Sequence, residues 1–272
     1  MNELKIKTNF TDIYTQNSPY EYLKEMDRLE YSISDSTKLL YNSIIKQIEK
    51  TVSRPINILD LGSSYGINSS LMKYDLTMLE LNNFFLSGSD PTKKETRQFY
   101  EECKNNDNMN FYQIDISKEA LKFSQEMNLC KKGMNVNLES EKLNLLESLP
   151  KIDIVIATGC VGYIGYKAFL NLLKIIKNRE LNLEKSKKEH INPIFAFSVH
   201  RMFDINDIEE VFEMYDYFLV KSDIKPIHQR NFFDVKEKEQ TISLLHKMGI
   251  DTKKYEDSGN CYADFYIARS KK

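Results

Sequence analysis

Hydrophobic positions recur along the chain with two periods, and the changes between them separate predicted helices from predicted strands. Helical spacing predicts two helices within residues 18–50, the second over 35–50, and further helices over 71–85, 118–129, 167–176, 208–215 and 237–247. Short apolar runs predict strands over 56–61, 110–116, 134–139, 152–158, 193–199, 217–220 and 262–268. Because strands and helices alternate, we expect a doubly wound α/β sheet of seven mostly parallel strands with helices on both faces.

The segments between these elements set the expected domain organisation. Residues 1–17 look loosely docked, residues 87–108 are polar, and a Lys/Glu-rich tract extends to residue 189. The two internal segments are typical of excursions on the surface. Since no Pro/Gly/Ser-rich linker divides the chain, we expect N-terminal helices over residues 1–50 and one globular unit over residues 51–272.

Composition and charge narrow the class of protein. The net charge is −2 and the sequence pI is about 6.2, which argues against a nucleic acid as the main partner. No apolar run has the length of a membrane span, and the N-terminus lacks the apolar core of a signal peptide. The four cysteines and four histidines show no metal-ligand spacing. We therefore expect a cytoplasmic protein with reduced thiols, no metal and no membrane attachment.

The glycines point to two segments where chemistry is expected. The chain has nine glycines, and five of them fall within residues 60–66 and 158–166. The first segment reads Asp-Leu-Gly-Ser-Ser-Tyr-Gly and directly follows the first predicted strand. Its spacing differs from that of a dinucleotide-binding loop, and no lysine follows the second glycine to meet a phosphate. A carboxylate beside a tight, bare loop favours an ammonium or sulfonium ligand instead.

This loop is similar to motif I of class I S-adenosylmethionine (SAM) methyltransferases, in which an acidic residue precedes a GxGxG pattern. Asp60, Gly62 and Gly66 match the pattern, and Ser64 stands at the middle glycine. The resemblance implies a Rossmann-like methyltransferase sheet and SAM as the cofactor. It assigns the cofactor-binding loop to Asp60, Gly62, Ser63, Ser64, Tyr65 and Gly66.

The resemblance also implies cofactor contacts from the next strands. In this family the second strand ends in an acid that binds the ribose hydroxyls. Asp115, followed by Ile116, takes that position if residues 87–108 are an insertion. Asp90 is the alternative acid. The end of the third strand flanks the adenine, which assigns Asn137, Leu138 and Glu139. The turn after the fourth strand adds Thr158 and Gly159.

Four residues are candidates for catalysis. Tyr163 and Tyr166 lie in the glycine-rich turn after the fourth strand, where an aromatic face stabilises a sulfonium and a hydroxyl can position or deprotonate a nucleophile. His200 and Arg201 follow the next strand, as a possible base and a carboxylate clamp. Packed aromatics and surface residues are the structural alternatives. The segment 228–230, His-Gln-Arg, is a weaker second set of polar candidates.

The whole pattern resembles stand-alone bacterial small-molecule methyltransferases, such as those of natural-product biosynthesis. That resemblance implies an N-terminal helical lid, with Tyr31 in contact with the cofactor, and methyl transfer to an O or N nucleophile of a small molecule. Two alternatives stay open. One is a SAM-using aminocarboxypropyl transferase or cyclase that releases methylthioadenosine; the other is a non-catalytic SAM-binding protein.

Overall fold

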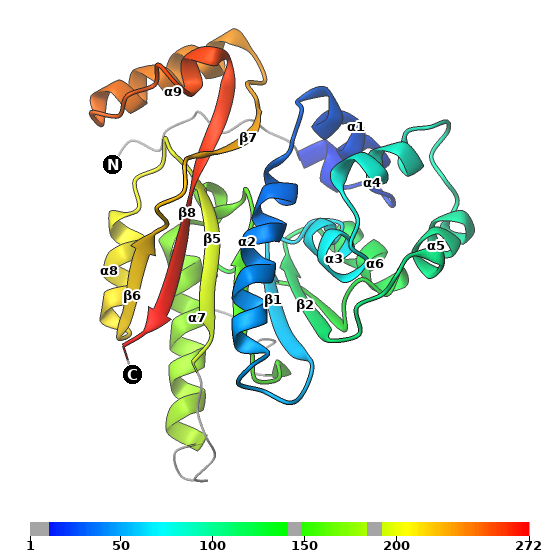
Figure 1. Ribbon diagram of the computed structural model, residues 1–272, viewed down its shortest axis with the longest axis horizontal. Helices are drawn as coiled ribbons and strands as arrows, with labels where there is room; N and C mark the ends of the chain where they lie inside the picture. Colours follow the sequence, from blue (N-terminus) through cyan, green and yellow to red (C-terminus); the bar gives the residue numbers. More distant parts are fainter. Residues whose placement is uncertain (1–10, 141–147, 184–191, 272) are drawn as a thin grey trace.

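An eight-stranded sheet organises the computed structural model, which describes residues 11–140, 148–183 and 192–271 (Figure 1). The strand order is β3-β2-β1-β4-β5-β8-β6, and β7 pairs with β8 beside this path. Strands β1 to β5 are parallel, whereas β8 runs antiparallel to β5, β6 and β7. The strands are β1 Ile56–Leu61, β2 Met109–Asp115, β3 Lys132–Asn135, β4 Ile154–Ala157, β5 Ile194–His200, β6 Tyr217–Lys221, β7 Ile227–Asn231 and β8 Asn260–Ser270.

Helices cover both faces of this sheet (Figure 1). Their bounds are η1 Thr11–Tyr14, α1 Tyr20–Arg28, α2 Ile33–Ile48, α3 Ile67–Lys73, α4 Met78–Phe85, α5 Lys93–Glu102, α6 Lys118–Glu126, α7 Val161–Leu183, α8 Asn206–Met214, α9 Val235–Lys247 and η4 Glu256–Ser258. The doubly wound, mostly parallel α/β fold expected from the sequence is confirmed. The predicted count of seven strands is wrong, because β7 adds an eighth.

The strand pleat explains the two layers. Successive side chains of a strand point to opposite faces, so a fully apolar strand feeds two cores. Ile58 and Ile154 pack in a core with α2, whereas their neighbours Leu59 and Val155 pack in the core on the other face with α7 and α8. Both faces of the sheet are thus covered by helices. A ligand can reach the sheet only at the ends of its strands.

The N-terminal helices belong to two different layers. Helix α2 contributes Ile33, Tyr41 and Ile45 to the core it shares with the sheet, whereas α1 packs with α4 away from it. Residues 33–48 are therefore joined to the sheet by a common core, although the sequence places them in the N-terminal part. The division at residue 50 stays a prediction.

The region expected to be a polar excursion contains helix α5. Thr92 caps its first turn, and Glu95 closes the capping box. Phe99 stacks on Phe84 of α4 with ring centroids 4.1 Å apart, and Tyr100 is buried against Ser70. The segment 87–108, predicted as a polar excursion on the surface, is mostly exposed and contains this ordered helix. A few apolar side chains in a mostly charged helix anchor it to α3 and α4.

Other differences concern element bounds. Strand β3 begins earlier than predicted and ends before Asn137, so residues 136–139 are loop. The stretch 71–85 is two helices, because Thr77 forms a capping box that starts α4. Helix α7 begins at Val161 and is interrupted at Gly165, whose φ of 62° and ψ of 179° are not helical. Part of the Lys/Glu-rich tract, residues 184–191, lies outside the described residues.

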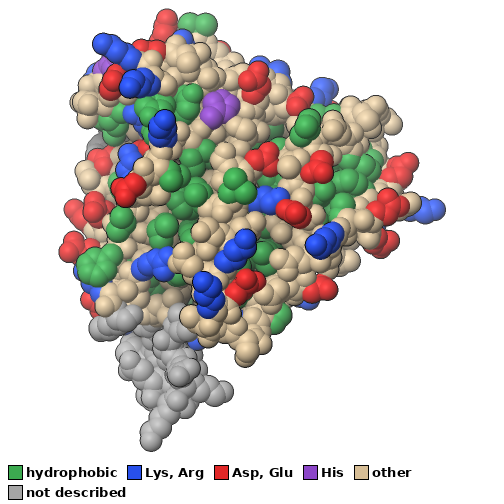
Figure 2. All heavy atoms as spheres, viewed as in Figure 1, with side chains coloured by type: hydrophobic (Ala, Val, Ile, Leu, Met, Phe, Trp, Pro, Cys, Tyr) green, Lys and Arg blue, Asp and Glu red, His purple; other side chains and the backbone are tan. Residues whose placement is uncertain are grey.

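The surface carries both signs of charge. On the face drawn in Figure 2, acidic and basic side chains are interspersed. Within residues 11–140, 148–183 and 192–271, no helix is long and apolar enough to cross a membrane. The same ranges contain no cluster of His, Cys, Asp and Glu side chains suited to a metal ion.

Candidate functional site

A cavity of about 510 Å³ lies beyond the carboxyl ends of β1, β2 and β4. This is the position where ligands bind in open α/β sheets, and the volume is that of a small-molecule site. The loops after β1, β2, β3 and β4 form its floor. The N-terminal segment and the β7 strand supply the remaining walls, through residues such as Tyr14, Tyr31 and Gln229.

The loop after β1 has an unusual backbone. Gly62, Ser64 and Gly66 all have positive φ, at 61°, 51° and 79°. A Cβ added at Gly62 would lie 2.7 Å from the Cβ of Cys160, so no side chain fits there. The Oγ atoms of Ser63 and Ser64 are buried and have no hydrogen-bond partner in the described part of the protein, although both residues line the cavity. The loop thus offers bare backbone and unsatisfied hydroxyls to a ligand.

Asp60 lies directly behind this loop. Its carboxylate is fully buried; Oδ1 accepts a hydrogen bond from Asn68 Nδ2 at 3.0 Å, and Oδ2 has no partner among the residues described. Burial raises the pKa of Asp60 to about 8. Asp60 does not itself line the cavity, but Asn68 does. A buried acid without a partner is best satisfied by a nearby cation.

Tyr65 and Gly66, like Asp60, do not line the cavity. The hydroxyl of Tyr65 donates to the carbonyl oxygens of Ile13 and Gln16, at 2.9 and 3.0 Å. Gly66 begins α3, and a Cβ there would lie 2.6 Å from Ser124 Oγ. These two residues shape the loop and hold the N-terminal segment over it, and direct ligand contact by either stays a prediction.

The structure separates the two candidate acids for the second strand. Asp115 is the last residue of β2 and lines the cavity; its Oδ2 accepts from Ser64 N at 2.7 Å and its Oδ1 from Ser117 N at 2.8 Å. Burial raises the pKa of Asp115. Asp90 lies outside any strand and accepts hydrogen bonds from Ser18 Oγ. Asp115 is thus the acid that the fold places beside the loop.

The other predicted cofactor residues also reach the cavity. Asn137, Leu138 and Glu139 line it from the loop after β3, and Ile116 lies at its rim with an exposed side chain. Thr158 and Gly159 line it after β4. Thr158 Oγ1 shares a hydrogen bond of 2.8 Å with Tyr41, and Gly159 N donates to Ser198 Oγ at 3.1 Å, so this turn is held rigidly.

Four tyrosines line the cavity: Tyr14, Tyr22, Tyr31 and Tyr163. Burial raises the pKa of Tyr31 to about 12 and raises the pKa of the other three. Their phenols therefore stay protonated at neutral pH. They provide π faces and neutral hydrogen-bonding groups, both of which suit a cationic ligand.

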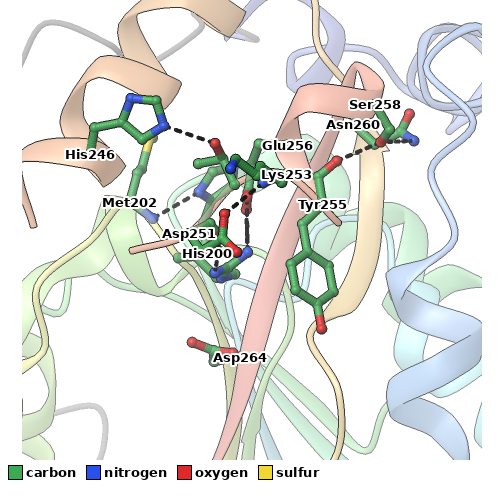
Figure 3. A network of polar contacts seen from close by, with 12 residues as sticks. His200, Met202, His246, Asp251, Lys253, Tyr255, Glu256, Ser258, Asn260 and Asp264 are labelled. Atoms are coloured by element: carbon green, nitrogen blue, oxygen red, sulfur yellow. Dashed lines mark hydrogen bonds and ion pairs between the residues drawn. The ribbon is translucent and has the colours of Figure 1, made fainter. Parts of the chain in front are cut away.

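Three of the four predicted catalytic residues lie outside the cavity lining: Tyr166, His200 and Arg201. Tyr166 is 38% exposed. His200 is buried, burial lowers its pKa to about 3, and its Nδ1 accepts from Met202 N at 3.2 Å (Figure 3). Arg201 forms a buried ion pair with Glu256 at 2.8 Å. Packing accounts for His200 and Arg201, and we leave all three out of the proposed site.

Two residues of β7 line the cavity instead, Gln229 and Arg230. Arg230 donates to both carboxylate oxygens of Glu237, at 3.0 and 2.7 Å. The sequence offered only a polar triplet at 228–230 as a signal, since no strand was predicted there, although its partner β8 was predicted over residues 262–268. Asn68 and Glu119 are further polar lining residues that sequence reasoning missed.

Comparisons with known proteins concern the fold. No protein-family model matches the chain, and no curated protein matches its sequence. Magnesium protoporphyrin IX methyltransferase of Synechocystis, with SAM bound, is 10% identical over 99% of both chains, with a TM-score of 0.46. Precorrin-6y C5,15-methyltransferase of Geobacter metallireducens is 9% identical over 80% of this chain and 81% of that one, with a TM-score of 0.40. A TehB-like SAM-dependent methyltransferase of Corynebacterium glutamicum is 10% identical over 88% and 98%, with a TM-score of 0.39. These likenesses are distant, so we infer the ligand from the cavity's own residues.

Proposed function

We propose that this chain is a SAM-dependent methyltransferase that transfers a methyl group to an O or N nucleophile of a small molecule. The observation that supports it most is the convergence on one cavity of three segments that the sequence assigned separately to SAM. These are the loop residues Gly62–Ser64, the strand-end acid Asp115 and the turn at Thr158–Gly159. They lie at the carboxyl ends of β1, β2 and β4, which are adjacent strands of the sheet.

The residues present fit the chemistry of SAM. Asp115 offers a carboxylate for the ribose hydroxyls, and residues 137–139 offer apolar and amide groups for the adenine. The unpartnered Asp60 Oδ2 lies behind the loop, and the ammonium or sulfonium of bound SAM would lower the pKa of this carboxyl, so that it ionises and stabilises the cation. Gly62 lets the ligand approach the backbone closely. Bound SAM would supply an electrophilic methyl group.

The chain itself contributes positioning and exclusion of water. The lining tyrosines are protonated at neutral pH, and His200 faces elsewhere, so neither supplies a ready base. Cys160 is not a nucleophile either, because burial raises the pKa of its thiol and the thiol donates to the Leu61 carbonyl. We therefore propose in-line transfer in which a fixed geometry provides most of the rate enhancement.

The tyrosine walls also favour a second candidate. A cage of π faces stabilises the whole sulfonium and would serve an aminocarboxypropyl transferase or cyclase equally well. The products separate the two reactions: S-adenosylhomocysteine (SAH) from methyl transfer and methylthioadenosine from the other. A non-catalytic SAM-binding protein would yield neither product. We further propose a cytoplasmic location, which the four free cysteines suit.

Calorimetric titration with SAM and SAH tests the proposal, with Asp115→Asn and Asp90→Asn as a matched pair. Asparagine keeps one acceptor oxygen but loses the negative charge and the second acceptor, so the affinity of the first variant should fall by roughly 100-fold. The Asp90 variant should bind within about twofold of the unchanged protein, since that acid does not line the cavity. Failure of the folded protein to bind either compound would refute the proposed function.

A further inference from the structure

An irregular pairing in β7 turns two consecutive side chains toward the cavity. His228 pairs with Tyr262 and Arg230 pairs with Cys261, so Gln229 is the extra residue of a β-bulge. In a regular strand, neighbouring side chains point to opposite faces. Here both Gln229 and Arg230 line the cavity, and both are buried. Bulges are a known device for re-aiming side chains beside active sites.

The bulge is fixed from the N-terminal side as well. Ser32 N donates to the Gln229 carbonyl at 3.0 Å, and Asn231 N donates to the Leu29 carbonyl at 2.6 Å. Ser32 Oγ shares a hydrogen bond of 2.7 Å with His228 Nδ1. The backbone around Gln229 is therefore held between β8 and residues 29–32. Its side chain has a defined direction, toward Gly159: a Cβ added at that glycine would lie 3.7 Å from Gln229 Nε2 and 3.2 Å from Tyr31 Oη.

The side-chain oxygen of Gln229 is unsatisfied. Gln229 is 7% exposed, and its Oε1 has no hydrogen-bond partner within the described ranges. A buried amide oxygen without a partner is destabilising, because it has lost its hydrogen bonds to water and gained none from the protein. Nε2 is the amide atom that lies toward Gly159, and a half-turn of the amide group would bring Oε1 to the same place, where a ligand N–H or O–H would satisfy it.

The charged side chains of the cavity as a whole disfavour an anionic acceptor. Asp115, Glu119 and Glu139 line the cavity, and Asp60 lies behind it. Of the described lining residues, Arg230 is the only Lys or Arg, and Glu237 neutralises its charge with a bidentate ion pair. A carboxylate or phosphate on the acceptor would meet acidic side chains with no Lys or Arg of the described lining left to offset them.

We propose that Gln229 is a specificity-determining residue, which selects an uncharged methyl acceptor by accepting a hydrogen bond from its O–H or N–H. Tyr31 and Tyr163 lie at the same end of the cavity and provide aromatic faces for a planar molecule. The acceptor class is thus a neutral, planar molecule with a hydrogen-bond donor, and anionic acceptors are excluded. This inference rests on the proposed function, because it takes the end at Gly159 as the acceptor side.

The test uses three probes of similar size, namely phenol, anisole and benzoate, added to the SAH-saturated protein and followed by ligand-observed NMR. Phenol carries the donor, anisole replaces it with a methyl ether, and benzoate carries the charge. Phenol should bind roughly threefold to tenfold more tightly than either of the others, the range expected for one hydrogen bond. Gln229→Met should remove this preference, whereas Gln229→Glu, which keeps an acceptor oxygen, should retain it.

Several outcomes overturn the inference. They are an unchanged phenol preference in the Met variant, benzoate binding as tightly as phenol, and no binding of any probe at millimolar concentration. Calorimetric binding of SAH by each variant shows that it is folded. If SAH itself fails to bind the unchanged protein, the proposed function fails. The ratio of phenol affinity to anisole affinity, measured on the ligand-free protein, then still decides whether Gln229 selects for a hydrogen-bond donor.

Discussion

Ser64 holds a backbone conformation that favours glycine. Its φ is 51°, and its buried Oγ lacks a partner in the described structure. Ser64→Gly should therefore raise the melting temperature of the ligand-free protein by about 2 °C, since relief of roughly 1 kcal/mol of left-handed strain exceeds the added chain entropy. Thermal unfolding of the variant measures the effect. Ser63→Gly is the control, because Ser63 has no positive φ and should gain nothing; a lower melting temperature for Ser64→Gly would contradict the argument.

Asp60 makes the stability of the protein depend on pH. Its pKa is raised by burial to about 8, so between roughly pH 4 and pH 8 the folded protein binds a proton that the unfolded chain has released. Stability should then fall as the pH rises through this window and level off above it. Asp60→Asn removes the titrating group, so the variant should become more stable relative to the unchanged protein, by roughly 2–4 kcal/mol between pH 5 and pH 8.

Urea unfolding of both proteins at several pH values provides that comparison. If the difference in free energy of unfolding between the two proteins stays constant across the pH range, the Asp60 carboxyl does not titrate with a raised pKa and the prediction is wrong.

At the scale of elements, one side chain of the β1 loop helps to hold the segment around η1, beside the hydrogen bond from Ser117 Oγ to the Tyr14 carbonyl. The Tyr65 hydroxyl donates to the Ile13 and Gln16 carbonyls, and Tyr14 lines the cavity. Tyr65→Phe removes both bonds, so the segment 11–17 should open and the affinity for SAH should fall by roughly fivefold to tenfold. Limited proteolysis with and without SAH measures the opening. Tyr74→Phe, another buried tyrosine of the same core, should leave both readouts unchanged.

The elements also show what the sequence could predict. Strands β1 and β4 are buried along their whole length and are apolar apart from Asn57 and Asp60 in β1, so their local pattern was sufficient. Strand β7 is mostly polar, and its identity depends on pairing with β8 some thirty residues later, which no local period reveals. The same limit applies to the site. The loop at 60–66 is a local motif, whereas Arg201 meets Glu256 and Gln229 meets the cavity through distant contacts.

At the scale of the molecule, the cavity joins the N-terminal segment, the sheet and β7 in one site. SAH at 100 times its dissociation constant should therefore stabilise the whole chain by about 2.7 kcal/mol and raise a single melting transition by roughly 5–8 °C. Differential scanning calorimetry measures this, with Asp115→Asn under the same SAH concentration as the control. A second transition that SAH leaves in place would show that residues 1–50 unfold as a separate unit.

Strand β8 has a consequence for how the protein matures on the ribosome. It pairs with β5, β6 and β7, so it supplies the strand partner of the cavity wall that carries Gln229. Synthesis proceeds from the N-terminus, and the β1 loop and Asp115 emerge long before residues 260–270 do. A nascent chain can thus assemble the parallel strands and their loops first. Discrimination among acceptors would be the last property it acquires.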